Sequence, residues 1–351
     1  MLYNTDDLRI TGMQEVLPPI TLHQELPITD LASETVFNAR SAMQKILHGK
    51  DDRLVVIIGP CSIHDPDAAR EYASRLKPLI SELKGELQII MRVYFEKPRS
   101  VVGWKGLIND PYLDGSFKIN DGLHLARKLL LDLAEMGVPA GSEYLDLISP
   151  QYIADLISWG AIGARTTESQ AHRELASGLS CPVGFKNATD GGLQIAVDAC
   201  LSASKPHHFM SLTKAGHSAI FSTTGNPDCH VILRGGKTPN YDSASINETA
   251  EIIGRTGLKP HFMVDCSHAN SGKSHIQQEV VCRDVVNQIA HGENRIMGLM
   301  LESNLVAGRQ NVEDGKALVY GQSITDACMA WDNSDVLLRE LAAAVRARRL
   351  K

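Results

Sequence analysis

The stretch LVVIIGP, residues 54–60, decides the fold class of this chain. It is too short for a helix and too apolar for a strand that exposes one face to water. Eight more runs of this kind, rich in Val, Ile and Met, follow along the chain: LQIIMRV (87–93), VPAGSE (138–143), AIGAR (161–165), PVGFK (182–186), HFMSL (208–212), HVILRG (230–235), FMVDCSH (262–268) and IMGLMLES (296–303). We interpret these runs as strands of a buried, parallel sheet.

Longer amphipathic segments separate the short runs, as in DAAREYASRLKPLISEL (67–83) and GLHLARKLLLDLAEM (122–136). Alternation of strand and helix over roughly 300 residues predicts an α/β fold, a (β/α)8 TIM barrel rather than an open sheet. Nine candidate strands compete for eight places, and the surplus falls at about 206–235. The segment there alternates and turns at Ala215-Gly216, which predicts an inserted β-hairpin. Either HFMSL or HVILRG belongs to this hairpin, and the other is the sixth barrel strand.

Residues 1–50 differ from the rest, and we interpret them as an N-terminal arm and helix ahead of a barrel domain at 51–351. An irregular, Pro-bearing stretch comes first, and the helix is predicted from Asp30 to His48, before Gly49. One face of that helix collects apolar side chains: Ala32, Val36, Ala39, Met43 and Ile46. An apolar face and an arm that needs a partner make self-association plausible.

Composition excludes several classes of partner. The 351 residues carry 35 Lys and Arg against 41 Asp and Glu, a net charge of −6, which argues against nucleic acid or an anionic membrane as partner. Seven cysteines, with no CxxC pair, do not make a disulfide framework. The first twenty residues show no signal-peptide pattern, and no apolar run approaches membrane-spanning length. We therefore expect a cytoplasmic protein.

Polar residues that end the predicted strands fall into two chemical groups, and in a barrel of this kind they meet at one rim. The first group offers a thiolate, an imidazole and two carboxylates, a set able to hold a divalent transition metal. Its members are Cys61, His268, Glu302 and, from a later loop, Asp326. A lone buried Cys or His is more often structural, and it is the strand-end position that favours ligation here.

The second group is cationic and contains Arg92, Lys97, Arg99, Arg165, Lys186 and Arg234. One further strand-end residue, Glu143 at the end of the third predicted strand, is acidic. A single Arg or Lys is usually a solvated surface charge. Six of them at one rim would repel each other unless anions lie between them, and guanidinium groups suit phosphate and carboxylate. The substrates are therefore expected to carry several negative charges.

Motifs along essentially the whole chain carry a resemblance to a known family. They are GPCSIHD (59–65), MRVYFEKPRS (91–100), GWKGLINDP (103–111), GARTTESQ (163–170), GFKNATDG (184–191), ILRGGK (232–237), VDCSHAN (264–270), ESN (302–304) and SITDAC (323–328). Together, and in this order, they resemble the class I-alpha 3-deoxy-D-arabino-heptulosonate 7-phosphate (DAHP) synthases. Ser100 and Ala188 differ from the most common family motifs, which have Thr and Gly at these positions.

The resemblance implies condensation of phosphoenolpyruvate with erythrose 4-phosphate, the first step of the shikimate pathway, and it assigns roles to residues. Lys97, Cys61 and His268 are implied as catalytic, and the metal ligands are Cys61, His268, Glu302 and Asp326. Mn²⁺ is the expected ion, with Fe²⁺, Co²⁺ or Zn²⁺ as alternatives. Phosphoenolpyruvate would be bound by Arg92, Lys97, Glu143, Ala164, Arg165, Lys186 and Arg234. Erythrose 4-phosphate, rather than the arabinose 5-phosphate of a sibling family, would be bound by Lys97, Pro98, Arg99, Ser100 and Asp326.

The resemblance is strongest to phenylalanine-sensitive members and implies a feedback site and a homotetramer, a dimer of dimers. The matching positions are Asp146, Leu147, Pro150, Gln151, Leu179, Ser180, Phe209, Ser211 and Phe221, with Asp6 and Asp7 from a neighbouring subunit's arm. A blander interpretation makes Phe209 and Phe221 core residues of the hairpin and the aspartates a frayed tail. Two other functions stay open: a non-catalytic, amino-acid-sensing barrel and a metal aldolase with an unrelated substrate.

Overall fold

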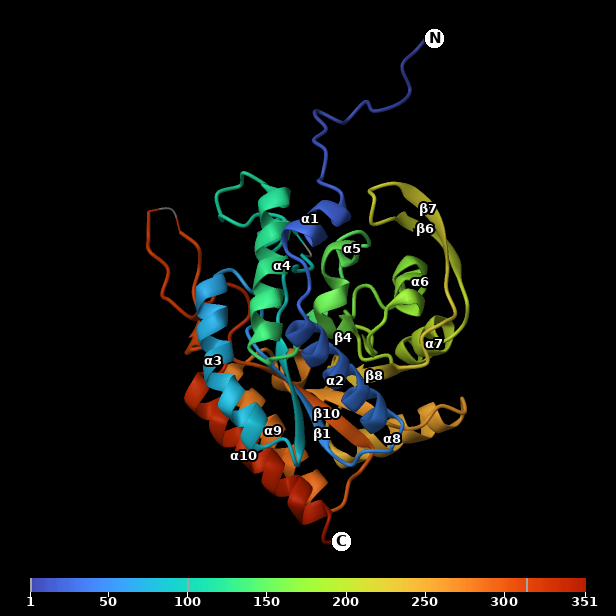
Figure 1. Ribbon diagram of the computed structural model, residues 1–351. Coiled ribbons are helices and arrows are strands. Elements are labelled where there is room, and N and C mark those ends of the chain that lie inside the picture. The colour runs from blue at the N-terminus through green and yellow to red at the C-terminus, as the bar shows by residue number, and fades with distance from the viewer. Residues whose placement is uncertain (1, 100, 314) are drawn as a thin grey trace.

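A closed barrel of eight parallel strands forms the centre of the computed structural model, which describes residues 2–99, 101–313 and 315–351 (Figure 1). The order around the barrel is β1, β10, β9, β8, β5, β4, β3 and β2, and nearly all residues of these strands are buried. The strands are β1 (Leu54–Gly59), β2 (Leu87–Arg92), β3 (Ala140–Glu143), β4 (Ile157–Ile162), β5 (Val183–Lys186), β8 (Cys229–Leu233), β9 (Phe262–Asp265) and β10 (Ile296–Glu302). The predicted TIM barrel is confirmed.

Helices follow the strands and cover the outside of the barrel (Figure 1). They are α3 (Pro66–Glu82), α4 (Ile119–Glu135), α5 (Pro150–Ile153) with the 3-10 turn Ala154–Leu156, α6 (Gln170–Gly178), α7 (Gln194–Ala203), α8 (Ser243–Gly254), the 3-10 turn His268–Ser271, α9 (His275–Ala290) and α10 (Trp331–Arg348). Local sequence sets several starts. Asp65 accepts hydrogen bonds from the backbone of Asp67 and Ala68, and Pro66 occupies the first helical position of α3.

The inserted hairpin consists of β6 (His208–Leu212) and β7 (Ser218–Ser222), paired antiparallel with Phe209 opposite Phe221. HFMSL therefore belongs to the hairpin, and HVIL, as β8, is the sixth barrel strand between β5 and β9. The hairpin lies beside α6, where one of its faces stays open to solvent (Figure 1). A second small sheet pairs β11 (Val306–Arg309) with β12 (Gln322–Ser323).

The N-terminal helix α2 spans Asp30–Leu47, as predicted to within one residue, and it follows the short helix α1 (Pro19–Glu25). All five residues of its predicted apolar face are buried. Met43 and Ile46 belong to the same apolar cluster as Trp159 and Met297, whose strands form the barrel. The apolar face thus has its partner inside the chain, and it gives no support for self-association.

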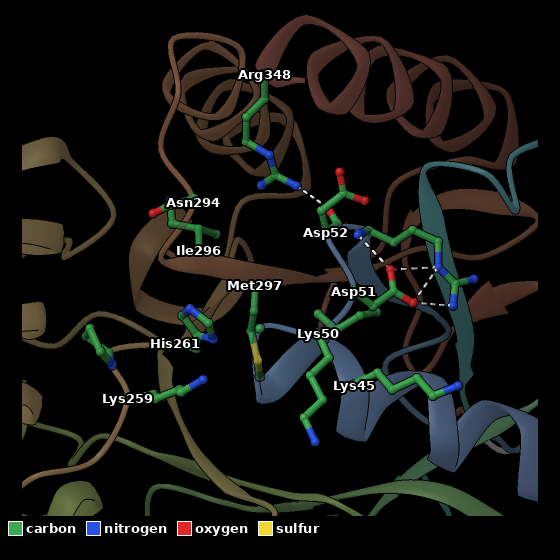
Figure 2. A pocket seen from close by; sticks show the side chains of 14 residues that line it. Lys45, Lys50, Asp51, Asp52, Lys259, His261, Asn294, Ile296, Met297 and Arg348 are labelled. Atoms are coloured by element: carbon green, nitrogen blue, oxygen red, sulfur yellow. Dashed lines mark hydrogen bonds and ion pairs between the residues drawn. The ribbon is translucent and has the colours of Figure 1, made fainter. Parts of the chain in front are cut away.

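A hollow of about 960 Å³ lies at the C-terminal end of α2 (Figure 2). Most of its charged groups are already engaged: Lys259 Nζ donates to His48 O at 2.7 Å, and His261 Nδ1 lies 2.8 Å from Leu47 O. Arg53 pairs with Asp51 at 2.7 Å. These contacts tie the last carbonyl groups of α2 to the barrel, which is the stabilising role expected of this end of the fold.

The arm preceding α1 extends away from the body of the molecule, and its residues 2–16 are exposed (Figure 1). Its junction with the body includes a hydrogen bond from Leu17 N to Asn120 Oδ1 at 3.0 Å. Among the described residues, no helix is long and apolar enough to span a bilayer.

Met43→Ala should lower the free energy of unfolding by about 2–5 kcal/mol, because it opens a cavity where α2 meets the barrel. Urea denaturation followed by circular dichroism measures this. Lys45→Ala, at an exposed position of the same helix, should change the free energy of unfolding by no more than about 0.5 kcal/mol. Equal losses in the two variants would contradict the role given to α2.

Candidate active site

A cavity of about 280 Å³ opens where the strands end, and it is lined by six Lys and Arg side chains against two carboxylates. It is lined by Lys97, Pro98, Arg99, Val101, Val102, Glu143, Gly163, Ala164, Arg165, Thr166, Lys186, Thr189, Arg234, His268, Lys273, Thr325 and Asp326. Parallel strand order alone brings these residues together, since they follow six different barrel strands and one later loop. Ser100, predicted to contact the aldose phosphate, lies outside the described residues.

Three of the four predicted metal ligands converge at one side of this cavity. Cys61 follows β1, Glu302 ends β10, and Asp326 lies in the loop after β12; their ligand atoms all lie within 4.8 Å of one another. Cys61 and Glu302 are buried, and Asp326 is half-buried. One thiolate with two carboxylates is a donor set that suits a borderline transition metal better than Ca²⁺ or Mg²⁺.

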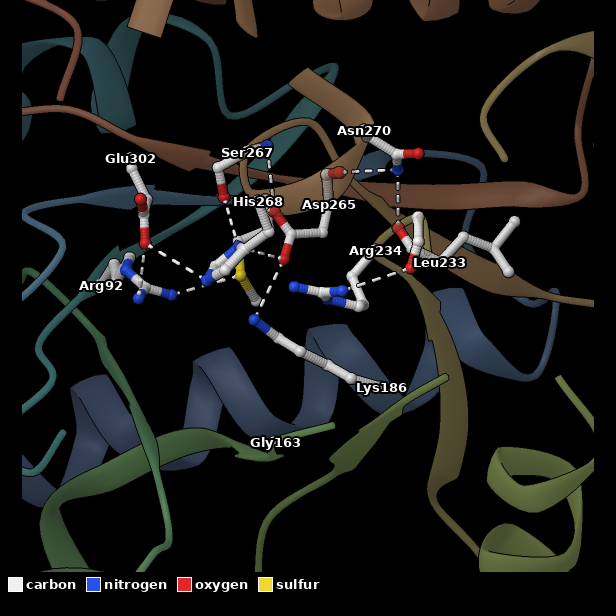
Figure 3. Close-up of polar contacts among 12 residues, drawn as sticks. Arg92, Gly163, Lys186, Leu233, Arg234, Asp265, Ser267, His268, Asn270 and Glu302 are labelled. Carbon is white, nitrogen blue, oxygen red and sulfur yellow. Dashed lines mark hydrogen bonds and ion pairs between the residues drawn. The ribbon is translucent and has the colours of Figure 1, made fainter. Parts of the chain in front are cut away.

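His268, the fourth predicted ligand, adjoins this group. Its Nε2 lies 3.7 Å from Glu302 Oε1, while its Nδ1 lies 2.8 Å from Asp265 Oδ2 (Figure 3). A ring with one nitrogen next to a carboxylate and the other near the ligand cluster is the usual arrangement of a metal-binding histidine. The described residues therefore fit a divalent metal.

Opposite charges set the ionisation of the buried groups. Burial alone would raise the pKa of Glu302, but His268 and Arg92 bring it below its ordinary value. Burial would also lower the pKa of Lys97, yet the neighbouring Cys61 and Glu302 raise it, so the ammonium group keeps its proton at neutral pH. Lys97 Nζ lies 3.1 Å from Cys61 Sγ. Burial raises the pKa of the Cys61 thiol, and binding of a cation would have to reverse that effect.

Five of the six predicted cations line the cavity, namely Lys97, Arg99, Arg165, Lys186 and Arg234. Arg92 does not: its guanidinium group is fully buried, donates to Glu302 Oε1 at 3.0 Å and to Pro60 O at 3.1 Å, and lies over the Tyr94 ring. Arg92 therefore fixes the proposed metal ligand Glu302 rather than facing the cavity.

Glu143 Oε1 is buried and has no hydrogen-bond partner within the described residues. Gly163 gives it room, because a Cβ at that position would lie 2.3 Å from this oxygen. Ala164, also predicted to contact substrate, lines the same wall. A buried, unpaired carboxyl oxygen is a group that a ligand or an ordered water can satisfy.

Sequence reasoning missed two residues of this site. Lys273 lines the cavity and lies 3.4 Å from Asp326 Oδ1. Asp265 is fully buried and lies 3.0 Å from Lys186 Nζ (Figure 3). A signal was available for Asp265, since it is the last residue of β9, three residues before the predicted strand end at His268.

A second cavity, of about 760 Å³, lies between α5, α6 and the hairpin. Seven of the predicted feedback positions line it: Pro150, Gln151, Leu179, Ser180, Phe209, Ser211 and Phe221. The rings of Phe209 and Phe221 stack with centroids 6.1 Å apart. Asp146 and Leu147 are not among the lining residues; Asp146 Oδ1 instead accepts hydrogen bonds from Ile148 N and Ser149 N. Asp6 and Asp7 lie in the extended arm.

Comparisons with known proteins give one consistent answer. The model of the DAHP synthetase I family matches residues 28–339. The Phe-sensitive phospho-2-dehydro-3-deoxyheptonate aldolase of Escherichia coli K12 is 62% identical over 99% of this chain and 100% of its own length. A Trp-sensitive form from Escherichia coli O157:H7 is 52% identical over 98% of this chain and 99% of its own length. The solved phospho-2-dehydro-3-deoxyheptonate aldolase of Francisella tularensis superposes with a TM-score of 0.95 at 52% identity, covering 97% of this chain and 99% of that one.

Cys61→Ser should weaken Co²⁺ binding and remove the thiolate-to-metal charge-transfer absorption band, because the softest ligand is lost. Spectroscopic titration of metal-free protein with Co²⁺ measures both effects. Cys181→Ser is the matched control, since Cys181 is equally buried but is not part of the ligand group. A Co²⁺ affinity and band unchanged in Cys61→Ser would remove this residue from the metal site.

Proposed function

The chain belongs to the DAHP synthetase I family, and from this premise we propose how its residues carry out the reaction. Its activity is that of a DAHP synthase: phosphoenolpyruvate, erythrose 4-phosphate and water give 3-deoxy-D-arabino-heptulosonate 7-phosphate and phosphate, the first step of the shikimate pathway. One observation in the structure supports the assignment of residues best. A ligand group for a metal adjoins a cavity at the barrel mouth that is lined by six cationic side chains, the five predicted ones and Lys273.

Cys61, His268, Glu302 and Asp326 would hold one divalent metal ion, with Mn²⁺ as our first choice and Fe²⁺, Co²⁺ or Zn²⁺ as alternatives. Bound there, the ion would supply Lewis-acid polarisation of the erythrose 4-phosphate aldehyde. Arg92 and Lys97 hold the backbone of Cys61 in place, since each donates a hydrogen bond to Cys61 O at 3.2 Å.

Phosphoenolpyruvate would bind where its carboxylate and phosphate meet the largest number of cations. Lys97, Arg165, Lys186 and Arg234 surround that part of the cavity, with Glu143 and Ala164 on the same wall. Guanidinium groups hold such anions with paired hydrogen bonds, and the ammonium groups add point charges. Neutralising both substrates here removes the repulsion that keeps two polyanions apart in water.

Erythrose 4-phosphate would bind nearer the opening, along the loop that follows β2. Pro98 and Arg99 line the cavity there, and Asp326 lies on the ligand-group side. Ser100, which carries a hydroxyl group as Thr would, is also assigned to this site in our proposal. The aldehyde carbon would then face C3 of phosphoenolpyruvate.

Bond formation joins C3 of phosphoenolpyruvate to the aldehyde carbon, water adds at C2, and phosphate leaves with cleavage of the C2–O bond. Lys97 is our candidate for the group that donates a proton to the aldehyde oxygen. Its ammonium group is buried, protonated at neutral pH, and held 3.2 Å from Cys61 O between the two proposed anion sites.

Regulation would use the second cavity. An aromatic amino acid, phenylalanine in our proposal, would place its ring near Phe209 and Phe221, with Pro150, Gln151, Leu179, Ser180 and Ser211 around it. Asp146 and Leu147 on the adjoining turn, and Asp6 and Asp7 from a neighbouring subunit's arm, would complete the site. Two aromatic rings already stacked at one wall support an aromatic effector.

We further propose a cytoplasmic homotetramer, a dimer of dimers, in which residues 1–50 serve assembly and regulation and residues 51–351 catalysis. Exposed apolar side chains on the arm and on the hairpin's outer face support contacts between subunits: Met13 is 86% exposed, Met210 86% and Ile220 78%.

Enzyme supplied with Mn²⁺, phosphoenolpyruvate and erythrose 4-phosphate should release one phosphate for each phosphoenolpyruvate consumed. The loss of phosphoenolpyruvate is followed by the decrease of its enol absorbance. EDTA should abolish both signals, and added Mn²⁺ should restore them, because the aldehyde is then polarised again. Arabinose 5-phosphate should replace erythrose 4-phosphate poorly. Full turnover by rigorously metal-free enzyme would overturn the proposed metal role.

Phe209→Ala should raise the phenylalanine concentration for half-inhibition at least about tenfold, as expected for a loss of about 1.4 kcal/mol of binding free energy. Inhibition curves of the same condensation assay measure this. Met210→Ala, on the opposite face of the same strand, should leave the inhibition curve unchanged. Inhibition of the unmodified enzyme by tyrosine and not by phenylalanine would contradict the proposed effector.

A further inference from the structure

One carboxylate connects the proposed metal site with the proposed phosphoenolpyruvate site. Asp265 ends β9 at the floor of the barrel mouth, and its side chain is fully buried. Its Oδ2 lies 3.0 Å from Lys186 Nζ, at the end of β5, and 2.8 Å from His268 Nδ1 (Figure 3). The two neighbours belong to different groups of the site, one a proposed metal ligand and the other a cation of the anion cavity.

Hydrogen bonds on the other carboxylate oxygen hold Asp265 in place. Its Oδ1 accepts from the Ser267 backbone at 3.0 Å and also from the Ser267 hydroxyl group. The same Ser267 Oγ lies 2.8 Å from His268 Nδ1. Asp265 is thus held through hydrogen bonds to Oδ1, while Oδ2 makes the two charge contacts and has no hydrogen bond of its own within the described residues.

This arrangement dictates which nitrogen of His268 carries the proton. A hydroxyl group has one hydrogen, and Ser267 gives it to Asp265, so Ser267 Oγ can only accept from His268 Nδ1. The nearby Asp265 Oδ2 favours a proton on Nδ1 as well. In the neutral ring, which is the form that binds a metal, the lone pair is therefore left on Nε2, the nitrogen that lies 3.7 Å from Glu302 Oε1 and faces the ligand group.

Lys186 depends on the same carboxylate. The residue is only 3% exposed, and among the described residues Asp265 is the one acidic side chain within 4 Å of its ammonium group. Burying an ammonium group is costly unless a counter-charge lies beside it. Asp265 supplies that counter-charge and fixes the Lys186 side chain at the wall of the cavity.

We propose that Asp265 is a positioning residue that serves both halves of the site at once. It sets the tautomer and orientation of His268 for the metal, and it anchors Lys186 for phosphoenolpyruvate. This inference rests on the proposed function, because it takes His268 as a metal ligand and Lys186 as a substrate contact.

Asp265→Asn tests it, because the amide has the same shape but must direct N–H groups at Lys186, His268 or Ser267, where only acceptors fit. Mn²⁺ affinity of the metal-free variant, measured by titration calorimetry, should fall about 10–100-fold. Phosphoenolpyruvate affinity, measured by calorimetry on metal-free enzyme so that the ion does not enter, should fall several-fold. An unchanged affinity for either ligand would overturn the shared role.

Asp228→Asn is the matched control. Asp228 Oδ1 lies 2.7 Å from His48 Nε2, and Gln44 donates to the other oxygen, so the same kind of carboxylate–imidazole contact is removed outside the cavity lining. Both affinities should match those of the unmodified enzyme. If Asp228→Asn weakens Mn²⁺ binding as much as Asp265→Asn does, the effect is one of general destabilisation and the proposal fails.

The unmodified enzyme offers a second test that needs no folded variant at Asp265. In metal-free protein with ¹⁵N-labelled histidine, raised to a pH at which the ring carries a single proton, the His268 signal, assigned with His268→Gln, should show that proton on Nδ1. A proton on Nε2 would overturn the proposal. Failure of the unmodified enzyme to bind Mn²⁺ or phosphoenolpyruvate at all would instead count against the proposed function itself.

Discussion

Pairing of buried opposite charges at the ends of parallel strands is the constraint on which the rest of this structure depends. Closing eight strands into a barrel directs the residue after each strand toward one small volume. Arg92 and Lys186 are buried there, and each has a carboxylate at 3.0 Å, Glu302 and Asp265 respectively. Removing one member of such a pair typically costs about 3–5 kcal/mol, because the other charge is left uncompensated. The floor of the site is thus electrostatically balanced within the protein.

The wall and opening of the cavity lack that balance. Arg165 and Arg234 line it without a carboxylate partner within 4 Å among the described residues, and Glu143 and Asp326 are the acidic groups in the lining. An excess of positive charge above a balanced floor is what a pair of phosphorylated substrates requires. Stability is supplied at the opposite end, where the apolar face of α2 packs against the barrel. Chemistry and stability are therefore separated along the barrel axis.

Much of this arrangement could be predicted from sequence because strand ends are visible there. The rule that chemistry follows a buried apolar run located Cys61, Lys186 and Glu302 without any contact information. It could not separate β6 from β8, since both are short and apolar and only the structure shows that β6 keeps one face in solvent. Nor could it find the partner of the apolar face of α2, because periodicity reveals a face and not what covers it.

Depth within the site was also invisible in the sequence. Arg92 and Arg165 look alike as strand-end arginines, yet the first lies beneath the ligand group and the second is exposed at the mouth. Spacing along the chain does not reveal Asp265, because it lies three residues before the more conspicuous His268 and its contact with Lys186 joins strands that are distant in sequence. Side-chain packing, rather than spacing along the chain, decides these relations.

The central claim is that one cavity holds both a metal ion and phosphoenolpyruvate. Diffraction from crystals of the enzyme with Mn²⁺ and phosphoenolpyruvate, recorded at the manganese absorption edge, tests it most directly. The account predicts an anomalous peak in contact with Cys61, His268, Glu302 and Asp326, with the phosphate and carboxylate of phosphoenolpyruvate among Lys97, Arg165, Lys186 and Arg234. An anomalous peak elsewhere, or phosphoenolpyruvate bound away from these cations, would contradict it.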